Sequence, residues 1–189
     1  MASFGAKRPI FNTIDTQPEG ERPTYKEEKP IEIGKLIKAD RTITLASGKL
    51  YANDELAESV DEFVSGNIAM ETDDMVDEVA TTLYGATVSN KEVSYKAGDT
   101  APEGGLAYYK VLMRSGKKVF KGYFYPRVKA VLGNDTAQTK GDSITFGTSA
   151  TSFTVFRCNS DEWVVTEEFE TEAACVAWCD EKLKPTPAA

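Results

Sequence analysis

The feature that most constrains the fold is a pair of aromatic-rich segments at residues 106–114 and 118–125, separated by Ser115-Gly116. Successive residues of a β-strand point to opposite faces. Large apolar side chains fall on both faces of this pair: Tyr108, Tyr109, Phe120, Tyr123, Phe124 and Tyr125. We therefore expect the central hairpin of a sheet, covered on one face by the core and on the other by a helix or another subunit.

The remaining sequence predicts further short strands separated by turns. The pattern between residues 31 and 70 is β, with turns expected at Ser47-Gly48, at Asn53-Asp54 and at residues 65–67. Alternation resumes at 127–131, 143–146, 153–157 and 163–165, with turns at 139–142 and 159–161. No internal repeat is present.

Two segments have helical periodicity. Residues 74–84 carry one apolar stripe, with Thr72 or Asp73 expected as the N-terminal cap and Gly85 at the end. Its stripe consists of Val76, Val79, Ala80 and Leu83. Residues 171–184 begin at the capping residue Thr171 and repeat Cys175, Trp178, Cys179 and Leu183, before Pro185 and Pro187 stop the helix.

These elements predict a mainly β fold, an antiparallel β-sandwich or half-barrel with two flanking α-helices. Residues 31–184 are expected to form this single domain. Residues 1–30 precede it with a strand near 8–14 and a long exposed loop at 15–29, because Pro, Glu, Lys and Thr dominate there. Residues 185–189 are expected to be a disordered tail.

The composition excludes several kinds of catalytic and metal-binding site. The chain has no histidine, which excludes Ser-His-Asp and Cys-His catalysis and His-ligated zinc. The net charge of −8 should repel nucleic acid, although a mildly acidic surface is common in cytosolic proteins. Three cysteines without a signal peptide indicate buried, reduced thiols. No apolar run reaches the ~20 residues of a membrane helix. We expect no catalytic residue, cofactor, metal or membrane contact.

Several segments, in this order, resemble the major tail protein of long-tailed bacteriophages. They are Gly5-Ala6-Lys7-Arg8-Pro9; Leu50-Tyr51-Ala52-Asn53 with Glu58; Gly66-Asn67-Ile68 with Asp73-Asp74 and Val79; Tyr125-Pro126-Arg127-Val128; and residues 139–146. Together they span most of the chain. Because one helix ends these 189 residues, we expect no immunoglobulin-like extension of the kind found on some relatives.

The resemblance implies a structural virion protein that forms six-membered rings. Such rings stack into a tail tube, and DNA leaves the capsid through the lumen without specific binding. The implied partners are other copies of the chain, a tape-measure protein, a tail terminator and a baseplate protein. The implied location is the virion tail, with assembly in the host cytoplasm.

Two groups of residues are candidates for these roles. Contacts between rings are expected at Asp40, Arg41, Leu45, Lys49, Tyr51, Asn53 and Asp54, and secondarily in the 15–29 loop. Acidic residues facing the lumen are expected among Glu55, Glu58, Asp61, Glu62 and Glu71. An ordinary solvated loop and an acidic outer surface are the alternative interpretations.

Two other functions remain open at this point. One is a head–tail connector or a secretion-system tube, which would form rings of the same general fold. The other is a carboxylate-dependent hydrolase that uses Asp73-Asp74 or Glu167-Glu168. Adjacent residues of a strand point to opposite faces, which argues against the second pair.

Overall fold

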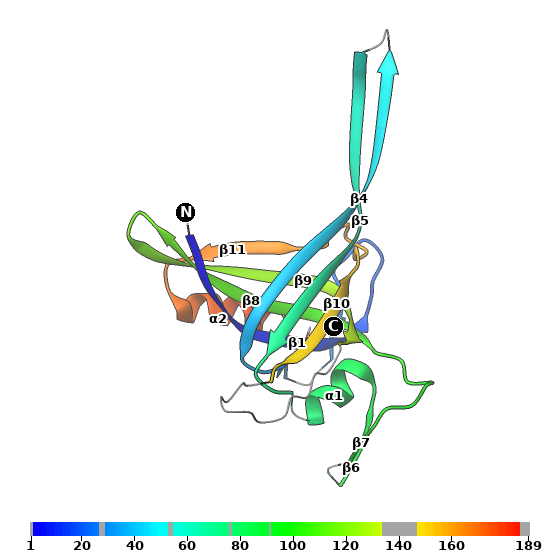
Figure 1. The fold of residues 1–189 in the computed structure, drawn as a ribbon, viewed down its shortest axis with the longest axis vertical. Coiled ribbons are helices and arrows are strands. Elements are labelled where there is room, and N and C mark those ends of the chain that lie inside the picture. Colours follow the sequence, from blue (N-terminus) through cyan, green and yellow to red (C-terminus); the bar gives the residue numbers. More distant parts are fainter. Residues whose placement is uncertain are drawn as a thin grey trace, which may run out of the picture.

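The computed structural model describes residues 2–26, 29–52, 55–75, 77–90, 92–133 and 147–185. Their main element is one antiparallel sheet with the strand order β2-β1-β8-β9-β10-β5-β4; β11 also pairs with β9, and β3 with β1 (Figure 1). Its strands are β1 (Ala2–Thr16), β2 (Thr24–Tyr25), β3 (Ile31–Glu32), β4 (Leu36–Ala52), β5 (Glu55–Thr72), β8 (Glu103–Arg114), β9 (Lys117–Leu132), β10 (Ser149–Val155) and β11 (Val165–Phe169). A separate hairpin pairs β6 (Thr87–Ser89) with β7 (Glu92–Ser94). The helices are α1 (Asp77–Tyr84) and α2 (Glu172–Lys182). The predicted mainly β fold with two helices is confirmed.

The β8–β9 hairpin is central, as predicted from its aromatic residues. Ser115 and Gly116 join the strands with φ angles of 47° and 80°. Two consecutive residues with positive φ are typical of the type I′ turn, whose twist matches that of the strands it connects. Arg114 then lies opposite Lys117.

Strand β9 continues through Pro126, so the predicted separate strand at 127–131 is wrong. β11 pairs with β9 up to Phe124, and β10 pairs with β9 from Val128 onward. On the β8 side the register shifts between Gly104 and Leu106. Proline has no N–H to donate, and it lies here at the interruption of both ladders. The Pro126 carbonyl accepts a hydrogen bond of 2.8 Å from the Tyr25 hydroxyl.

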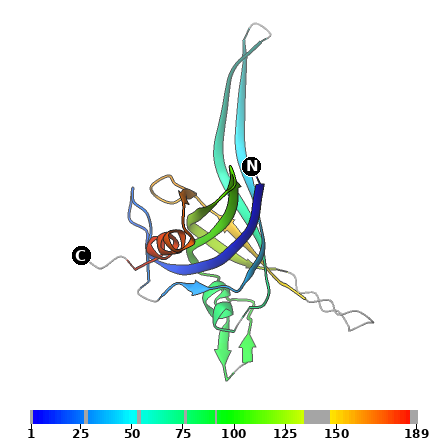
Figure 2. The same cartoon turned by 90° about the vertical axis from the view of Figure 1, so that its left-hand side faces the viewer.

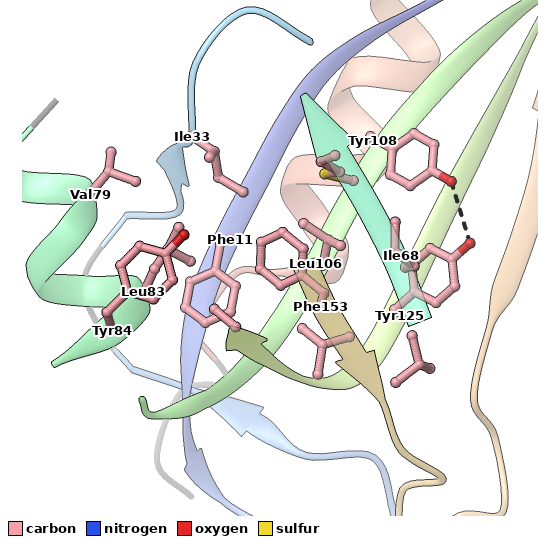
Figure 3. Close-up of a cluster of buried hydrophobic side chains, with 14 of the residues drawn as sticks. Phe11, Ile33, Ile68, Val79, Leu83, Tyr84, Leu106, Tyr108, Tyr125 and Phe153 are labelled. Carbon is pink, nitrogen blue, oxygen red and sulfur yellow. Dashed lines mark hydrogen bonds between the residues drawn. The ribbon is translucent and has the colours of Figure 1, made fainter. Parts of the chain in front are cut away.

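One face of the sheet encloses the main core. Phe11, Tyr125 and Phe153 meet there, and Phe11 and Phe153 have ring centroids 6.2 Å apart (Figure 3). Helix α1 closes this core with Val79, Ala80 and Leu83, all buried. The apolar stripe predicted at these three positions is therefore confirmed. Val76 lies outside the described residues.

The opposite face is covered by α2, which lies alongside β8, β9 and β11 (Figure 2). Trp178, Cys179 and Leu183 pack there against Ile10 and Phe124. The prediction that a helix or a subunit covers the second face is confirmed for this part of the sheet. All three cysteines are free and buried.

Of the two predicted helix caps, one is confirmed and the other is wrong. Thr171 caps α2, since its hydroxyl accepts the Ala174 N–H at 3.3 Å, as predicted. The cap predicted for α1 at Thr72 or Asp73 is wrong, because α1 begins at Asp77 and Thr72 belongs to β5. The Asp73 carboxylate instead accepts the Lys35 N–H at 2.7 Å.

The N-terminal segment is more ordered than predicted. β1 begins at Ala2 rather than at residue 8, and the loop expected at 15–29 contains β2 with the buried Tyr25. Arg22 binds the Glu162 carboxylate through two nitrogens at 2.5 and 2.7 Å. The composition did not predict this order, because a few long-range contacts hold in place a polar segment that has no core of its own.

Some predictions fall on undescribed residues: the turn at 139–142, the strand at 143–146 and most of the C-terminal tail. The turn predicted at Asn159-Ser160-Asp161 is supported by a hydrogen bond of 3.0 Å from the Asp161 N–H to the Cys158 carbonyl. Within the described part of the chain, none of the helices has the length and apolarity needed to cross a bilayer.

Candidate assembly surface

The hairpin of β4 and β5 extends well beyond the body of the molecule (Figure 1). β4 pairs with β5 from Leu36 to Ala52, but β10 pairs only with the Gly66–Thr72 part of β5. Beyond Gly66 the sheet therefore narrows to two strands. We call residues 44–52 and 55–65 the ribbon; at about 3.3 Å per residue it is roughly 30 Å long.

Two of the turns predicted inside this region, at Ser47-Gly48 and at residues 65–67, are wrong, and the third, at Asn53-Asp54, lies outside the described residues. Ser47 and Gly48 lie within β4, opposite Asp61 and Val60, and the Ser47 hydroxyl donates to the Asp61 carboxylate. Residues 65–67 lie within β5, where an added Cβ on Gly66 would be 3.3 Å from the Val155 Cβ. Ser-Gly and Gly-Asn are common in turns, but at Gly66 the missing side chain instead permits the close approach of β10.

The ribbon exposes an unusual number of large apolar side chains. It holds half of the twelve large hydrophobic residues that are exposed in the described chain: Leu45, Leu50, Tyr51, Leu56, Val60 and Val64, each at least 50% exposed. Among the described residues, no further strand pairs with either of its edges. A two-stranded hairpin is marginally stable alone, and an unpaired edge can bind another chain. The ribbon therefore has the properties of a surface that becomes buried on assembly.

Alternation along the ribbon separates its charges. Glu58 and Glu62 lie opposite Leu50 and Ala46 on the outward face of the ribbon. This face is continuous with the side of the sheet that points away from the main core. Asp61 lies on the other face, opposite Ser47. The single lysine of the ribbon, Lys49, shares that face with Asp61, so the outward face has the excess of negative charge.

The five acidic residues expected to face a lumen are thus distributed over different places. Four of them belong to the ribbon: Glu55 opposite Ala52 at its far end, Glu58 and Glu62 on one face, and Asp61 on the other. Glu71 lies in the body, between Lys38 of β4 and Ala150 of β10.

The residues expected to contact another ring also divide into groups. Leu45, Lys49 and Tyr51 belong to the exposed ribbon. Asp40 and Arg41 lie in the body near its base, while Asn53 and Asp54 are outside the described residues. The second candidate, the 15–29 loop, is held against the body: Asn159 donates to the carbonyls of Gln17 and Pro18, both at 2.9 Å.

A second feature, which the sequence did not predict, lies on the core-side face near the ribbon base. The rings of Phe63 and Trp163 are stacked with centroids 4.6 Å apart, and the Arg41 guanidinium lies 5.4 Å from the Trp163 centroid. Lys110 lies 5.4 Å above the Tyr123 ring, and Lys121 lies 6.0 Å from it. We call these six residues the aromatic–basic surface.

The charges of this surface influence one another. Burial lowers the pKa of Lys110, and the nearby positive charge of Arg41 lowers it further, while Asp40 acts in the opposite direction. Asp40 is paired with Lys38 at 2.6 Å. The aromatic–basic surface is thus a local concentration of positive charge in a chain of net charge −8.

On the same face of the sheet, the Glu168 carboxylate forms ion pairs with two basic residues. Glu168 of β11 lies opposite Lys121 and accepts contacts from Arg114 at 2.5 Å and from Lys121 at 3.5 Å. One signal in the sequence could have revealed the surface: Tyr108 and Lys110 alternate on β8, and Lys121 and Tyr123 alternate on β9 opposite them.

The acid pairs considered for hydrolysis have structural partners. Asp73 accepts the N–H groups of Lys35 and Asp74, and these bonds, the first above all, lower the pKa of its carboxyl group. Asp74 in turn accepts the Met75 N–H at 2.8 Å. Glu168 is engaged by Arg114 and Lys121, and no group of three potential metal ligands is found among the described residues.

Comparison with known proteins gives no assignment. No protein-family model and no curated protein matches this chain.

Proposed function

We propose that this protein is a self-assembling structural subunit, and specifically the tail tube subunit of a long-tailed bacteriophage. The observation that carries the proposal is the ribbon. It exposes apolar side chains and two edges with which no strand of the described chain pairs, at a free-energy cost that a monomer would not recover.

The position of the ribbon supports a polymer rather than a closed dimer. The ribbon and the hairpin β6–β7 lie at opposite ends of the molecule in both views (Figures 1 and 2). A contact between a ribbon and a different surface of the next copy is heterologous, and such contacts generate rings or open polymers. The sequence segments that resemble the major tail proteins support the same assignment.

Under this proposal, six copies form a ring and rings stack into a tube in the virion tail, assembled in the host cytoplasm. The tape-measure protein occupies the lumen during assembly, and terminator and baseplate proteins bind the two ends. DNA passes through without specific binding, since the net charge of −8 disfavours contact with phosphates. No catalysis, cofactor or metal is part of the proposal.

Electron microscopy of the purified, untagged protein over a concentration series tests the proposal. Hollow rods with a regular axial repeat are expected. The matched variant replaces residues 47–61 by a two-residue turn between the paired Ala46 and Glu62, which removes most of the ribbon and leaves the part of β5 that pairs with β10. It should remain folded by circular dichroism and form no rods. A protein that stays monomeric even with tape-measure and baseplate proteins would overturn the proposal.

The same images separate the alternatives. A connector would stop at isolated rings, whereas a tube subunit adds rings without limit. A secretion-system tube would also polymerise, and the genes adjacent to its own would distinguish it from a phage protein. A carboxylate-dependent hydrolase would show sugar hydrolysis that Asp73→Asn abolishes.

A further inference from the structure

The ribbon needs a receiving surface on the next copy, and its chemistry restricts the choice. Its described residues contain four acids, Glu55, Glu58, Asp61 and Glu62, against one lysine. Leu50 and Val60 share the outward face with Glu58 and Glu62. A complementary surface must therefore offer both apolar area and positive charge.

The aromatic–basic surface has both properties. Trp163, Phe63 and Tyr123 provide flat aromatic area that is only partly buried. Arg41 and Lys110 place positive charges over these rings. Burial lowers the pKa of Lys110, and the nearby positive charge of Arg41 lowers it further. A carboxylate between two such cations relieves their repulsion and forms charge-assisted hydrogen bonds.

A protomer cannot fill this surface with its own ribbon tip. Arg41 lies opposite Ile68, just inside the point at which the ribbon leaves the body. The ribbon then runs outward for roughly 30 Å at about 3.3 Å per residue. The acidic face of the ribbon also continues the outside of the sheet, whereas Arg41 shares the core-side face with Ile68. The contact must therefore be made by a second copy.

We propose that the outward, acidic face of one ribbon docks on the aromatic–basic surface of a second copy of this chain. Glu58 and Glu62 meet Arg41 and Lys110, while Leu50 and Val60 pack on the rings of Trp163 and Tyr123. The inference rests on the proposed function and specifies its intermolecular contact. Because the two surfaces differ, each added copy leaves one ribbon and one receiving surface unoccupied, so growth continues.

Charge reversal on the two surfaces tests the contact. The first variant carries Glu58→Lys and Glu62→Lys, and the second carries Arg41→Glu and Lys110→Glu. Either one alone places like charges together, so the concentration at which polymer sediments should rise at least about tenfold. An equimolar mixture should recover wild-type sedimentation, because the reversed ribbon of one variant then meets the reversed surface of the other.

Two controls separate charge complementarity from damage to the fold. Both variants must retain the wild-type circular dichroism spectrum and thermal midpoint. The matched variant Lys96→Glu with Lys184→Glu, at two exposed positions, changes the net charge by the same amount as Arg41→Glu with Lys110→Glu and should assemble like the wild type. Raised salt should weaken wild-type assembly and restore part of the assembly of each variant, because it screens these contacts.

The outcomes distinguish the two proposals. Wild-type tubes together with unaffected variants would overturn this contact and leave the tube assignment in place. Failure of the mixture to recover assembly would also overturn it, since both surfaces would then act through other partners. Wild-type protein that never assembles would overturn both proposals. Retardation of double-stranded DNA that Arg41→Glu with Lys110→Glu abolishes would instead assign the surface to nucleic acid.

Discussion

Phe63 and Trp163 lie parallel, with ring centroids 4.6 Å apart and an angle of 6° between their planes. Phe63 belongs to β5 at the base of the ribbon, and Trp163 comes from the loop before β11. This stack connects the ribbon to the body next to Arg41, whose guanidinium lies 5.4 Å from the same indole. The orientation of the ribbon therefore depends on a contact between segments 100 residues apart in sequence.

Trp163→Ala should make the base of the ribbon more mobile and the protein less stable. The substitution removes the stack and the cation–π contact, so the free energy of unfolding should fall by about 1–2 kcal/mol in urea titrations. Hydrogen exchange in β4 and β5 should accelerate most near Phe63. Trp163→Phe keeps an aromatic ring and should lose less than half as much. Equal losses in the two variants would mean that the ring contact does not fix the ribbon.

Leu50→Gln with Val60→Gln should impair assembly without weakening the monomer. These side chains are 59% and 50% exposed, so their replacement should change the free energy of unfolding by no more than about 0.5 kcal/mol. Burial of each in an interface is worth about 1.5–3 kcal/mol, so the threshold for polymerisation should rise at least about tenfold. Val131→Gln, also 50% exposed but in the body, is the control. Sedimentation measures all three proteins.

Glu103→Gln should lower the free energy of unfolding near neutral pH and should have no effect in strong acid. Arg127 binds the Glu103 carboxylate at 2.8 and 3.0 Å and Gln17 donates at 2.8 Å, and the Arg127 bond is the main cause of the lowered pKa. A lowered pKa in the folded state stabilises the protein fully above the ordinary value of 4.5 and ceases to do so as pH falls through the folded-state pKa.

The measurement for Glu103 is the unfolding midpoint of wild type and Glu103→Gln as a function of pH. The two curves should be separated near neutrality and converge in acid. Glu19→Gln, at an exposed position, should follow the wild-type curve. A separation that stays constant into strong acid would contradict the assignment of the effect to ionised Glu103.

Gly122→Ala should displace α2 from the sheet. A Cβ at this position of β9 would lie 2.7 Å from a ring carbon of Trp178, closer than packed carbon atoms approach. We expect a loss of about 1–3 kcal/mol in stability and a shift of tryptophan fluorescence. Gly98→Ala, where the Cβ would meet no atom within 4 Å, is the matched control and should be nearly neutral. Wild-type stability of Gly122→Ala would show that the indole has room to move.

Thr171→Ala should weaken the start of α2. The lost side-chain acceptor for the Ala174 N–H is worth about 1 kcal/mol, and Thr171→Ser should preserve most of it. Urea titration followed by far-ultraviolet circular dichroism measures both variants. An unchanged midpoint in Thr171→Ala would indicate that water or another group satisfies this N–H equally well.

Local pattern in the sequence was sufficient for much of the fold. The two-sided aromatic strands required a covered central hairpin, and their Ser115-Gly116 turn was placed correctly because glycine accommodates the positive φ that the turn needs. The same holds for α2, since Thr171 and the spacing of Cys175, Trp178 and Cys179 are local signals. Such features depend on residues a few positions apart.

The tertiary structure alone decided the features that bear on function. Ser47-Gly48 and Gly66 suggested turns, yet both lie inside long strands, because pairing between β4 and β5 satisfies their backbone groups along the whole hairpin. Arg41, Lys110 and Trp163 are brought together from three distant segments only by the order of strands in the sheet. The sequence determines which residues alternate along a strand, whereas proximity between strands depends on long-range pairing that no local spacing encodes.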